Sequence, residues 1–357
     1  MKHVLVYGMT NNAGGIETYL LGLFRRQQGK GVRFDFVSDF PSVCGGEELA
    51  AGGARLHFIP AKSKNLRGHL AGMWRILRQH PEYKTVYFNI VDAGAAVTML
   101  PAFLLGRRIV AHSHNGSTDK LRLHRLCRPV LKLMAHRRAA CSPLAAEYMF
   151  GAAGAKALVI PNAIDARRFS FRRETREATR AALGLKDEPV FIHVGRLSPE
   201  KNPLGLVDIF EAIHRKRPDA VLLSVGDGES AGEMKAYLAE KGLETSVRCL
   251  GIRTDVAELL QAADVFLFPS FHEGLGIAVL EAQTAGLPCV ISDTIPEMVS
   301  VTEPVYRISL EESRERWAEV ALGCLDLPRR DTREDLIRAG FDSSCCGEYD
   351  NKLTEWF

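Results

Sequence analysis

Short apolar runs alternate along the first half of the chain with longer stretches in which apolar residues recur at helical spacing. The runs predict strands at residues 4–7, 33–37, 55–59, 85–89 and 108–112, and the longer stretches predict helices at 16–26, 68–79 and 94–105. Strands that alternate with helices are typical of a parallel sheet covered by helices on both faces. The first half therefore predicts a Rossmann-like α/β domain.

A second alternating block starts near Pro189. Its predicted strands are residues 190–194, 220–225, 247–250, 265–268 and 289–292, again with helices between them. We expect an N-terminal domain at 1–170, a charged helical linker at 171–188 and a C-terminal domain at 189–335. A C-terminal helix at 336–357 could return to the N-terminal domain. The fold class is thus α/β, with two Rossmann-like domains whose parallel sheets face a central cleft.

The most informative stretch is residues 268–288, which predicts a strand, a glycine loop, a helix over 277–285 and a stop at Gly286. A glycine loop before a helix presents unpaired N–H groups and a positive dipole end, which suit a phosphate. Glu273 and Glu281 frame this site. Because carboxylates repel phosphate but accept hydrogen bonds from hydroxyls, they indicate a phosphorylated sugar or a nucleotide sugar. A solvated glutamate and an ordinary turn are the alternative interpretation.

Two cations follow the strand at 190–194. Arg196 and Lys201 lie where a ligand at the carboxyl ends of the strands would bind, and together they could hold a diphosphate. The turns Gly226-Asp-Gly228 and Gly251-Ile252 follow the next two strands and point to the same edge of the sheet. Taken singly, each cation could equally be a solvated surface charge.

The first loop opens a helix at Gly14-Gly15 and could approach a phosphate there. Its glycines do not match the G-x-G-x-x-G dinucleotide pattern, so the sequence does not favour an NAD enzyme. The eight cysteines form no C-x-x-C pair and no zinc-spaced cluster. Buried free thiols in a reducing cytosol are the simpler interpretation, and no signal peptide or membrane span is predicted.

Several motifs together resemble the retaining GT-B glycosyltransferases of family 4, and more narrowly those that build bacterial capsule, exopolysaccharide or O-antigen units. In the second half they are Gly195-Arg-Leu with Glu200-Lys-Asn202, Gly226-Asp-Gly228, and Pro269-Ser followed by Glu273-Gly-x-Gly-x4-Glu281-Ala, in which seven residues separate the two glutamates. In the first half they are Gly14-Gly-x-Glu17, Ala111-His-Ser-His-Asn115, Cys141-Ser142 and Pro161-Asn-Ala-Ile-Asp165. The resemblance extends to about Ser309.

The resemblance implies a role for each site residue. Arg196 and Lys201 would bind the donor diphosphate and stabilise the departing nucleotide, Glu273 would contact the donor sugar, and Glu281 would contact the ribose. His114 would lie near the transferred sugar, with His112 as its rival. The remaining expected contacts to the phosphates and the sugar are Gly14, Gly15, Gly195, Asn202, Gly226, Ile252, Gly274, Gly276 and Ile277. No cofactor and no metal ion are expected.

The implied reaction transfers a sugar from a nucleotide sugar, with UDP as the expected nucleotide, to a saccharide or a polyprenyl-diphosphate-linked saccharide. Front-face displacement would retain the anomeric configuration, and Glu273 acting as a nucleophile in a double displacement is the alternative. Two other functions stay open from the sequence. One is a nucleotide-sugar 2-epimerase on the same architecture, and the other is a non-catalytic protein that kept the fold.

Residues 120–138 hold seven Lys or Arg residues and no acidic residue, with leucines between them. The pattern predicts a basic amphipathic segment that could lie on an anionic membrane. An ordinary helix with a solvated basic face is the alternative. The expected location is therefore cytoplasmic, with peripheral contact to the inner face of the plasma membrane. The net charge of +3 does not by itself indicate nucleic-acid binding.

Overall fold

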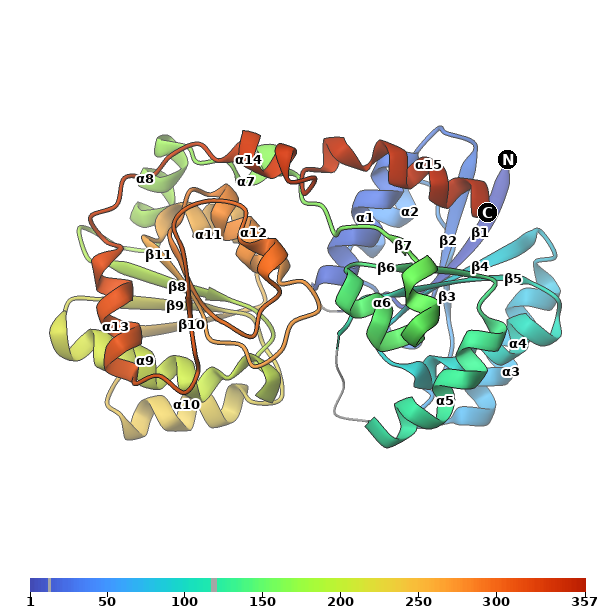
Figure 1. The fold of residues 1–357 in the computed structure, drawn as a ribbon, viewed down its shortest axis with the longest axis horizontal. Coiled ribbons are helices and arrows are strands. Elements are labelled where there is room, and N and C mark those ends of the chain that lie inside the picture. The colour runs from blue at the N-terminus through green and yellow to red at the C-terminus, as the bar shows by residue number, and fades with distance from the viewer. Residues whose placement is uncertain (12–13, 117–120) are drawn as a thin grey trace. The chain divides into compact units, whose positions relative to one another are not determined.

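The computed structural model describes residues 1–11, 14–116 and 121–357, which form two compact units (Figure 1). Unit 1 comprises Met1–Ala163 together with Cys345–Phe357, and unit 2 comprises Ile164–Ser344. Each unit is an α/β layer structure with its own parallel sheet.

Unit 1 contains a parallel sheet with the strand order β3-β2-β1-β4-β5-β6-β7. The strands are β1 (Lys2–Tyr7), β2 (Val32–Ser38), β3 (Leu56–Phe58), β4 (Tyr83–Ile90), β5 (Arg108–Ser113), β6 (Arg137–Ala140) and β7 (Leu158–Val159). β1 and β4 lie at the centre, and their residues are almost completely buried because helices cover both faces of the sheet.

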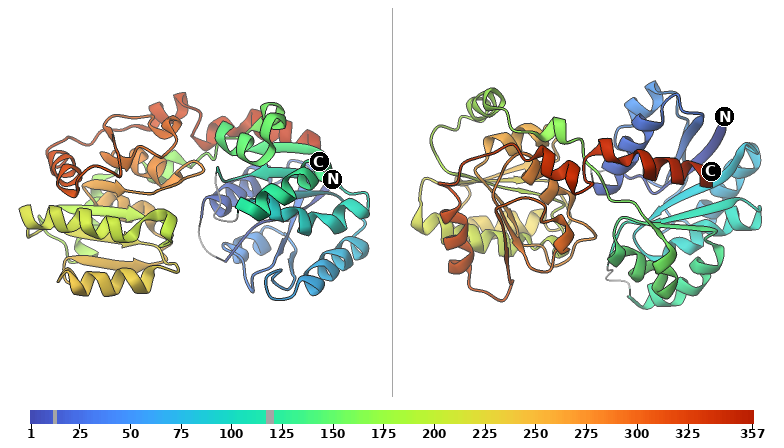
Figure 2. Two further views of the ribbon diagram at one scale, coloured as in Figure 1. Left: turned by 60° about the horizontal axis from the view of Figure 1, so that its bottom comes forward. Right: turned by 45° about the horizontal axis from the view of Figure 1, so that its top comes forward.

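Helices cover the two faces of this sheet as separate layers (Figure 2). One layer holds α3 (Leu66–Gln79), α4 (Ala96–Leu104), α5 (Leu121–Met134) and α6 (Pro143–Phe150), and it packs on a core that includes Leu77, Phe88 and Phe150. The other layer holds α1 (Gly15–Gln27), α2 (Gly46–Ala51) and α15 (Gly347–Trp356), around Leu20, Phe36 and Tyr87.

Unit 2 repeats the plan with a six-stranded parallel sheet in the order β10-β9-β8-β11-β12-β13. Its strands are β8 (Val190–Val194), β9 (Val221–Val225), β10 (Val247–Gly251), β11 (Val265–Phe268), β12 (Cys289–Ser292) and β13 (Val305–Ile308). Its helices are α7 (Ala166–Phe169), α8 (Arg173–Ala182), α9 (Pro203–Lys216), α10 (Ala231–Glu240), α11 (Val256–Ala262), α12 (Ile277–Thr284), α13 (Arg314–Gly323) and α14 (Arg333–Arg338). The predicted class, two Rossmann-like domains with parallel sheets, is confirmed.

The segment expected as a linker, residues 171–188, packs within unit 2. Arg176 on α8 binds the carboxylate of Asp264 at 2.5 Å, and Arg180 donates to the carbonyl of Ala262 at the end of α11. These arginines bring positive charge to the carbonyl end of α11, which stabilises the helix dipole. The contacts place the change from unit 1 to unit 2 between Ala163 and Ile164, before the expected linker begins.

The end of the chain packs in unit 1 on the layer that contains α1. Leu353 and Phe357 are buried in its core, and the ring of Phe357 lies against Phe34 and Tyr87. Arg26 and Asp350 form an ion pair at 2.8 Å between α1 and α15. These contacts hold the last residues of the chain, Cys345–Phe357, against the N-terminal part of unit 1.

Residues 120–138 do not form one continuous helix. Lys120 lies outside the described residues, α5 ends at Met134, and Arg137 and Arg138 belong to strand β6. Strands β6, β7 and β13 are not predicted by the sequence pattern, because they are short and contain arginines or partly exposed residues. Among the described residues, no helix is both long and apolar enough to cross a membrane.

Candidate active site

Three loops at the carboxyl ends of β8, β9 and β10 are hydrogen-bonded to one another. Gly195 donates to the carbonyl of Val225, and Gly226 donates to the carbonyl of Gly251. Gly226 has a φ of +132°, and a Cβ atom at this position would lie 1.9 Å from the carbonyl oxygen of Gly195. Only glycine allows this approach, so the predicted residues Gly195 and Gly226 hold two edge loops together.

Lys201 and Glu273 form an ion pair in the next part of this edge. Lys201 Nζ lies 2.5 Å from Glu273 Oε1, and the hydroxyl of Ser270 donates to the same oxygen at 3.0 Å. Ser270 is completely buried, and the side chain of Glu273 is 9% exposed. The two donors hold Oε1, so the carboxylate has a fixed orientation.

Asn202 connects the lysine turn to the glutamate loop. It has a left-handed backbone (φ 55°), its side-chain oxygen caps α9 by accepting from Gly205 N–H, and its amide nitrogen donates to the carbonyl of Pro269 at 3.1 Å. Phe271 N–H also donates to the carbonyl of Glu200. Both ends of the Asn202 amide therefore have protein partners, and the residue positions Lys201 relative to Glu273.

Arg196 projects from the loop after β8 and is largely exposed. Its guanidinium lies 2.9 Å from the carboxylate of Glu229, which follows the Gly226-Asp-Gly228 turn. Both side chains are more than half exposed, so the pair contributes little to folding stability. The guanidinium can therefore exchange this carboxylate for another anion at small cost in free energy. Ile252 is exposed at the neighbouring loop after β10.

Glu281 lies on α12, which begins at Ile277 after Gly276. Burial raises the pKa of Glu281 to about 7, although the nearby Arg168 of α7 lowers it in part. The residue as a whole is half-buried. Near neutral pH this group exists in both protonation states, and hydroxyl donors would favour the ionised one.

The N-terminus of α12 is formed by backbone alone. Gly276 has a φ of +93° and occupies the N-cap position, and no side chain caps the helix. The first-turn N–H groups of α12 are thus oriented as a phosphate requires. Gly274, Gly276 and Ile277 are buried or half-buried at this point, consistent with a backbone contribution from each of them.

In unit 1 the predicted His114 follows β5 and is buried. Its Nε2 lies 2.9 Å from the side-chain oxygen of Asn89, whose amide nitrogen donates to the carbonyl of Tyr7. Because Asn89 must accept from His114, the imidazole carries its proton on Nε2. Burial lowers the pKa of His114 to about 3, so the ring is neutral. Its Nδ1 has no hydrogen-bond partner among the described residues and can accept a hydrogen bond.

His112, the rival of His114, is bound inside unit 1. Its Nδ1 lies 2.5 Å from the hydroxyl of Tyr87, which is hydrogen-bonded to Tyr19 of α1. The Tyr19 ring also lies against the His114 ring, with 5.4 Å between the centroids. Tyr19 thus connects His114 to α1, the helix whose N-terminus is formed by Gly14 and Gly15.

Glu17 fixes the start of α1. Its carboxylate accepts from the backbone N–H and the hydroxyl of Thr10, both at 2.8 Å, and burial raises its pKa. A Cβ atom on Gly14 would lie 2.8 Å from the other carboxylate oxygen of Glu17. The glycine therefore lets the loop pass close to this glutamate.

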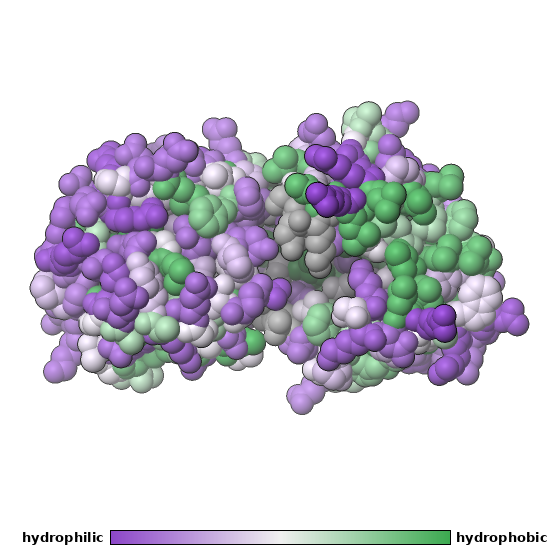
Figure 3. Space-filling model, turned by 90° about the horizontal axis from the view of Figure 1, so that it is seen from below, coloured by the Kyte–Doolittle hydropathy of each residue, from purple (hydrophilic) through white to green (hydrophobic). Residues whose placement is uncertain are grey.

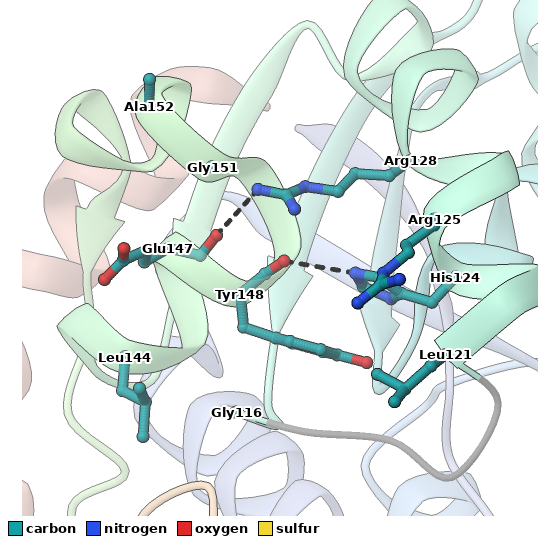
Figure 4. Close-up of a pocket in the computed structure, with 10 residues that line it drawn as sticks. All are labelled: Gly116, Leu121, His124, Arg125, Arg128, Leu144, Glu147, Tyr148, Gly151 and Ala152. Atoms are coloured by element: carbon teal, nitrogen blue, oxygen red, sulfur yellow. Dashed lines mark hydrogen bonds between the residues drawn. The ribbon is translucent and has the colours of Figure 1, made fainter.

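A pocket of 470 Å³ lies elsewhere in unit 1, between α5 and α6 (Figure 4). His124 stacks on Tyr148 in this pocket, and the guanidinium groups of Arg125 and Arg128 extend toward α6. Arg128 donates to the backbone carbonyl of Glu147 at 3.2 Å. None of the residues predicted to bind the donor lines this pocket.

Two family models match the chain in sequence, one in each half. The model "Glycosyltransferase Family 4" matches residues 13–168, and the model "Glycosyl transferases group 1" matches residues 175–341. The two matches follow the same order as the two Rossmann-like units.

The chain belongs to the GT-B glycosyltransferases of family 4.

Curated relatives of this glycosyltransferase support the assignment. It is 29% identical over 360 residues to the candidate glycosyltransferase EpsF of Bacillus subtilis, a match that covers 96% of this chain and 93% of EpsF. It is 40% identical over 142 residues to the UDP-Gal:alpha-D-GlcNAc-diphosphoundecaprenol alpha-1,3-galactosyltransferase of Escherichia coli. That match covers 39% of this chain and 37% of the relative.

Solved structures share the fold of this glycosyltransferase. Anabaena Alr3699/HepE, solved in complex with UDP-glucose, superposes with a TM-score of 0.82 over 99% of this chain and 100% of that chain, at 20% identity. The match confirms the GT-B architecture that the sequence predicted.

Unit 2 of the glycosyltransferase places Arg196, Lys201, Glu273 and Glu281 at one end of the sheet, after β8 and β11, as the order of strands predicted. Three functional candidates were missed. Ser270 stood within the Pro-Ser motif without a role, Glu229 followed the glycine turn, and Arg168 lay at the end of the expected N-terminal domain. The Pro-Ser motif was a usable signal for Ser270, whereas nothing in the sequence distinguished Arg168.

Among the described residues, no group of three or more His, Cys, Asp or Glu side chains is arranged to hold a metal ion. None of the eight cysteines, all of which lie among these residues, forms a disulfide bond.

Proposed function

We propose that this glycosyltransferase takes a sugar from a UDP-linked donor and transfers it with retention of the anomeric configuration. The observation that carries the proposal is the ion pair of Lys201 and Glu273. The pair joins a cation, which we assign to the diphosphate, to a carboxylate, which we assign to a sugar hydroxyl, at the end of the sheet where Arg196 and the α12 N-terminus also lie. A nucleotide sugar offers both kinds of group next to each other.

Each residue has a distinct role in the proposed reaction. Lys201 and Arg196 bind the diphosphate and stabilise the negative charge that grows on it as the bond to the sugar breaks. Glu281 accepts hydrogen bonds from the ribose hydroxyls, and the first-turn N–H groups of α12 bind a phosphate oxygen. His114, neutral and protonated on Nε2, accepts a hydrogen bond from a hydroxyl of the transferred sugar through Nδ1.

The surroundings of Glu273 favour sugar binding over nucleophilic attack. Its Oε1 accepts from an ammonium and a hydroxyl at the same time, and both donors withdraw electron density from the carboxylate. We therefore propose front-face displacement, in which the departing phosphate takes the proton of the acceptor hydroxyl. Arg196 and Lys201 supply the positive charge that the leaving group needs.

The proposed acceptor is a saccharide or a lipid-linked saccharide in the synthesis of a cell-surface polysaccharide. The support is the activity of the E. coli relative, which acts on a diphosphoundecaprenol-linked sugar. We also propose peripheral contact with an anionic membrane through the basic residues of 120–138. A 2-epimerase is not favoured, since both halves match glycosyltransferase models.

The test is a panel of UDP-, GDP- and ADP-sugars with nucleotide release as the measured product. Release from one UDP-sugar, absent in Lys201→Ala, supports the proposal. Proton NMR of the product made with an added acceptor then reports the anomeric configuration. Conversion of the donor to another nucleotide sugar without net nucleotide release would establish the epimerase instead.

A further inference from the structure

Unit 2 exposes few large apolar side chains. On the face shown in Figure 3, its surface on the left is largely hydrophilic, and apolar residues are scattered over it. Every residue of unit 2 is described by the structure, and its exposed large apolar residues are Ile252, Phe271, Met298, Tyr306 and Ile337. Phe271 is 42% exposed, whereas the other phenylalanines of unit 2 are buried or half-buried. Unit 2 thus leaves one phenyl ring exposed, and that ring lies two residues before Glu273.

Phe271 belongs to the loop that follows β11, at the carboxyl edge of the sheet of unit 2. Ligands of open α/β sheets bind at this edge. The residue before Phe271 is Ser270, whose hydroxyl donates to the Glu273 carboxylate, and the residue after it is His272, which is also exposed. A phenyl ring and an imidazole therefore lie at the surface directly before the carboxylate that we assign to the sugar.

Hydrogen bonds from other parts of unit 2 fix the backbone at Phe271. The carbonyl of Ser270 accepts from the hydroxyls of Ser292 and Thr294, at 2.5 and 2.9 Å. The N–H of Phe271 donates to the carbonyl of Glu200 at 2.8 Å. With the backbone fixed, the position of the ring depends on two side-chain torsions, so covering the ring costs little conformational entropy.

The Phe271 ring differs in its contacts from the nearby ring of Phe268. Phe268 is buried, stacks on His193 with 5.7 Å between the centroids, and has the ammonium of Lys201 at 6.0 Å from its centroid. Among the residues that the structure describes, neither a ring nor a cation packs on Phe271 in this way. Its exposed surface is therefore available to a ligand.

We propose that the Phe271 ring stacks on one face of a pyranose ring bound beside Glu273. The C–H groups of a sugar face carry a small positive charge and pack on the negative face of an aromatic ring, and the contact removes apolar area from water. It requires a sugar face without axial hydroxyl groups, so Phe271 selects among sugars by the stereochemistry of their hydroxyls. The inference rests on the proposed function, since it requires Glu273 to face a sugar.

Two substrates of the proposed reaction carry a pyranose ring, the nucleotide-sugar donor and the saccharide acceptor. Loss of a contact with the donor sugar raises the KM of the donor, and loss of a contact with the acceptor raises the KM of the acceptor. Neither contact involves the nucleotide, so the affinity for free UDP should not depend on Phe271.

The first experiment uses Phe271→Trp in the full chain as a fluorescent reporter. The parent, which has three tryptophans, supplies the spectrum that is subtracted. The probes are UDP, UDP-glucose and UDP-galactose, and the methyl glycosides of glucose, galactose and N-acetylglucosamine added together with UDP. The difference emission should shift to shorter wavelength with a sugar and not with UDP alone. Tyr306→Trp on β13, where the tyrosine is 40% exposed, is the matched control and should respond to none of them.

The second experiment measures KM and the turnover number for Phe271→Leu, Phe271→Ala and Phe271→Trp. Leucine keeps an apolar side chain but removes the aromatic face. Both Phe271→Leu and Phe271→Ala should raise the KM of one substrate by roughly two- to twelvefold, the range for an aromatic contact, and Phe271→Trp should retain the KM of the parent. Calorimetry should give the same UDP affinity for all three variants.

Several results would overturn the proposal. One is unchanged KM values for donor and acceptor in Phe271→Leu and Phe271→Ala. Another is a difference emission that does not respond to sugar, or that belongs to a buried indole before any ligand is added, since the ring would then pack on protein. Weaker UDP binding in Phe271→Leu would show a distorted loop instead of a lost sugar contact. Failure of the proposed function itself is a separate observation, in which the parent releases nucleotide from no UDP-sugar, and it would refute both.

Discussion

Lys201 Nζ lies 2.5 Å from Glu273 Oε1, so the residue assigned to the diphosphate and the residue assigned to the sugar form one ion pair. The lysine turn and the glutamate loop are further joined by the amide of Asn202. Removal of Lys201 will therefore alter the orientation of Glu273, and effects on phosphate and sugar binding should not be separable at Lys201.

Replacing Lys201 with alanine should lower the turnover number by about 10²–10³-fold, the usual loss when one donor to a developing charge is removed. Lys201→Arg should recover only part of the activity, because the guanidinium fork does not fit the single-oxygen contact with Glu273. Steady-state kinetics with the cognate donor measures both variants, and Lys216→Ala on α9 is the surface control. Near-normal turnover in Lys201→Ala would contradict the assignment.

Ser270 should prove to be a positioning residue for Glu273. Ser270→Ala removes the second donor to Oε1 without changing charge, so we expect a lower turnover number with nucleotide affinity unchanged. Ser270→Thr keeps the hydroxyl and should retain more activity than Ser270→Ala. Calorimetry with UDP and kinetics with the donor together give the two readouts. Weaker UDP binding in Ser270→Ala would point to a general distortion of the loop instead.

The two glutamates should separate ribose binding from sugar binding. Glu281→Gln should weaken binding of free UDP and of the UDP-sugar alike, because the ribose contact is the same in both and in the transition state. Glu273→Gln should leave UDP affinity nearly unchanged and lower the turnover number. Loss of UDP affinity in Glu273→Gln with normal affinity in Glu281→Gln would reverse the two roles.

The raised pKa of Glu281 predicts pH-dependent stability and binding. The folded state holds the proton up to pH about 7, while the unfolded chain releases it near pH 4.5. Rising pH between these values therefore destabilises the free protein, by on the order of 1–3 kcal/mol, and this loss should be absent in Glu281→Gln. Urea unfolding from pH 4.5 to 8 compares the two proteins.

The same ionisation should couple to the nucleotide. Because ribose hydroxyls favour the carboxylate form, UDP affinity should rise with pH up to about 7 and binding at pH 6 should release a proton. Calorimetry in two buffers with different ionisation enthalpies measures that proton. An equal proton release in Glu281→Gln would assign it to another group.

Asn89 should control the protonation state of His114. In Asn89→Asp the carboxylate would lie beside Nε2 of the imidazole and raise the pKa of His114 from its value of about 3. The neutral form needed to accept a sugar hydroxyl would then be lost at low pH, so kcat/KM should fall as pH decreases through the new pKa. Asn89→Ala adds no charge, so its kcat/KM should not show this fall as pH decreases. NMR titration of His114 gives the pKa, and an unchanged value in Asn89→Asp would refute the argument.

The sequence predicted where the candidate residues of unit 2 lie, because strand order alone brings them to one edge of the sheet. Arg196 and Lys201 follow β8, Glu273 follows β11, and neighbouring parallel strands end at the same edge of a sheet. Which of these side chains contact one another depends instead on their length and direction. Nothing in the spacing showed that Lys201 would pair with Glu273, 72 positions away, or that Arg168 would lie near Glu281.

The limits of the fold prediction have a similar origin. β6 and β13 carry arginines and partly exposed residues, so their sequences lack the apolar run that indicates a buried strand. They form because they pair with strands that are already in place. The linker was misplaced because a charged helical sequence is typical of a solvated connection, whereas the arginines of α8 bind backbone carbonyls of unit 2.

The packing of α15 in unit 1 has a consequence for synthesis of the chain. Residues 1–163 emerge from the ribosome first, but the surface of Phe34 and Tyr87 that receives Phe357 stays uncovered until all of unit 2 has been translated. At about 5–20 residues per second this interval lasts roughly 10–40 s. During that time the apolar surface of unit 1 that later receives Phe357 stays uncovered. Unit 1 can therefore complete its folding only after unit 2 has been translated.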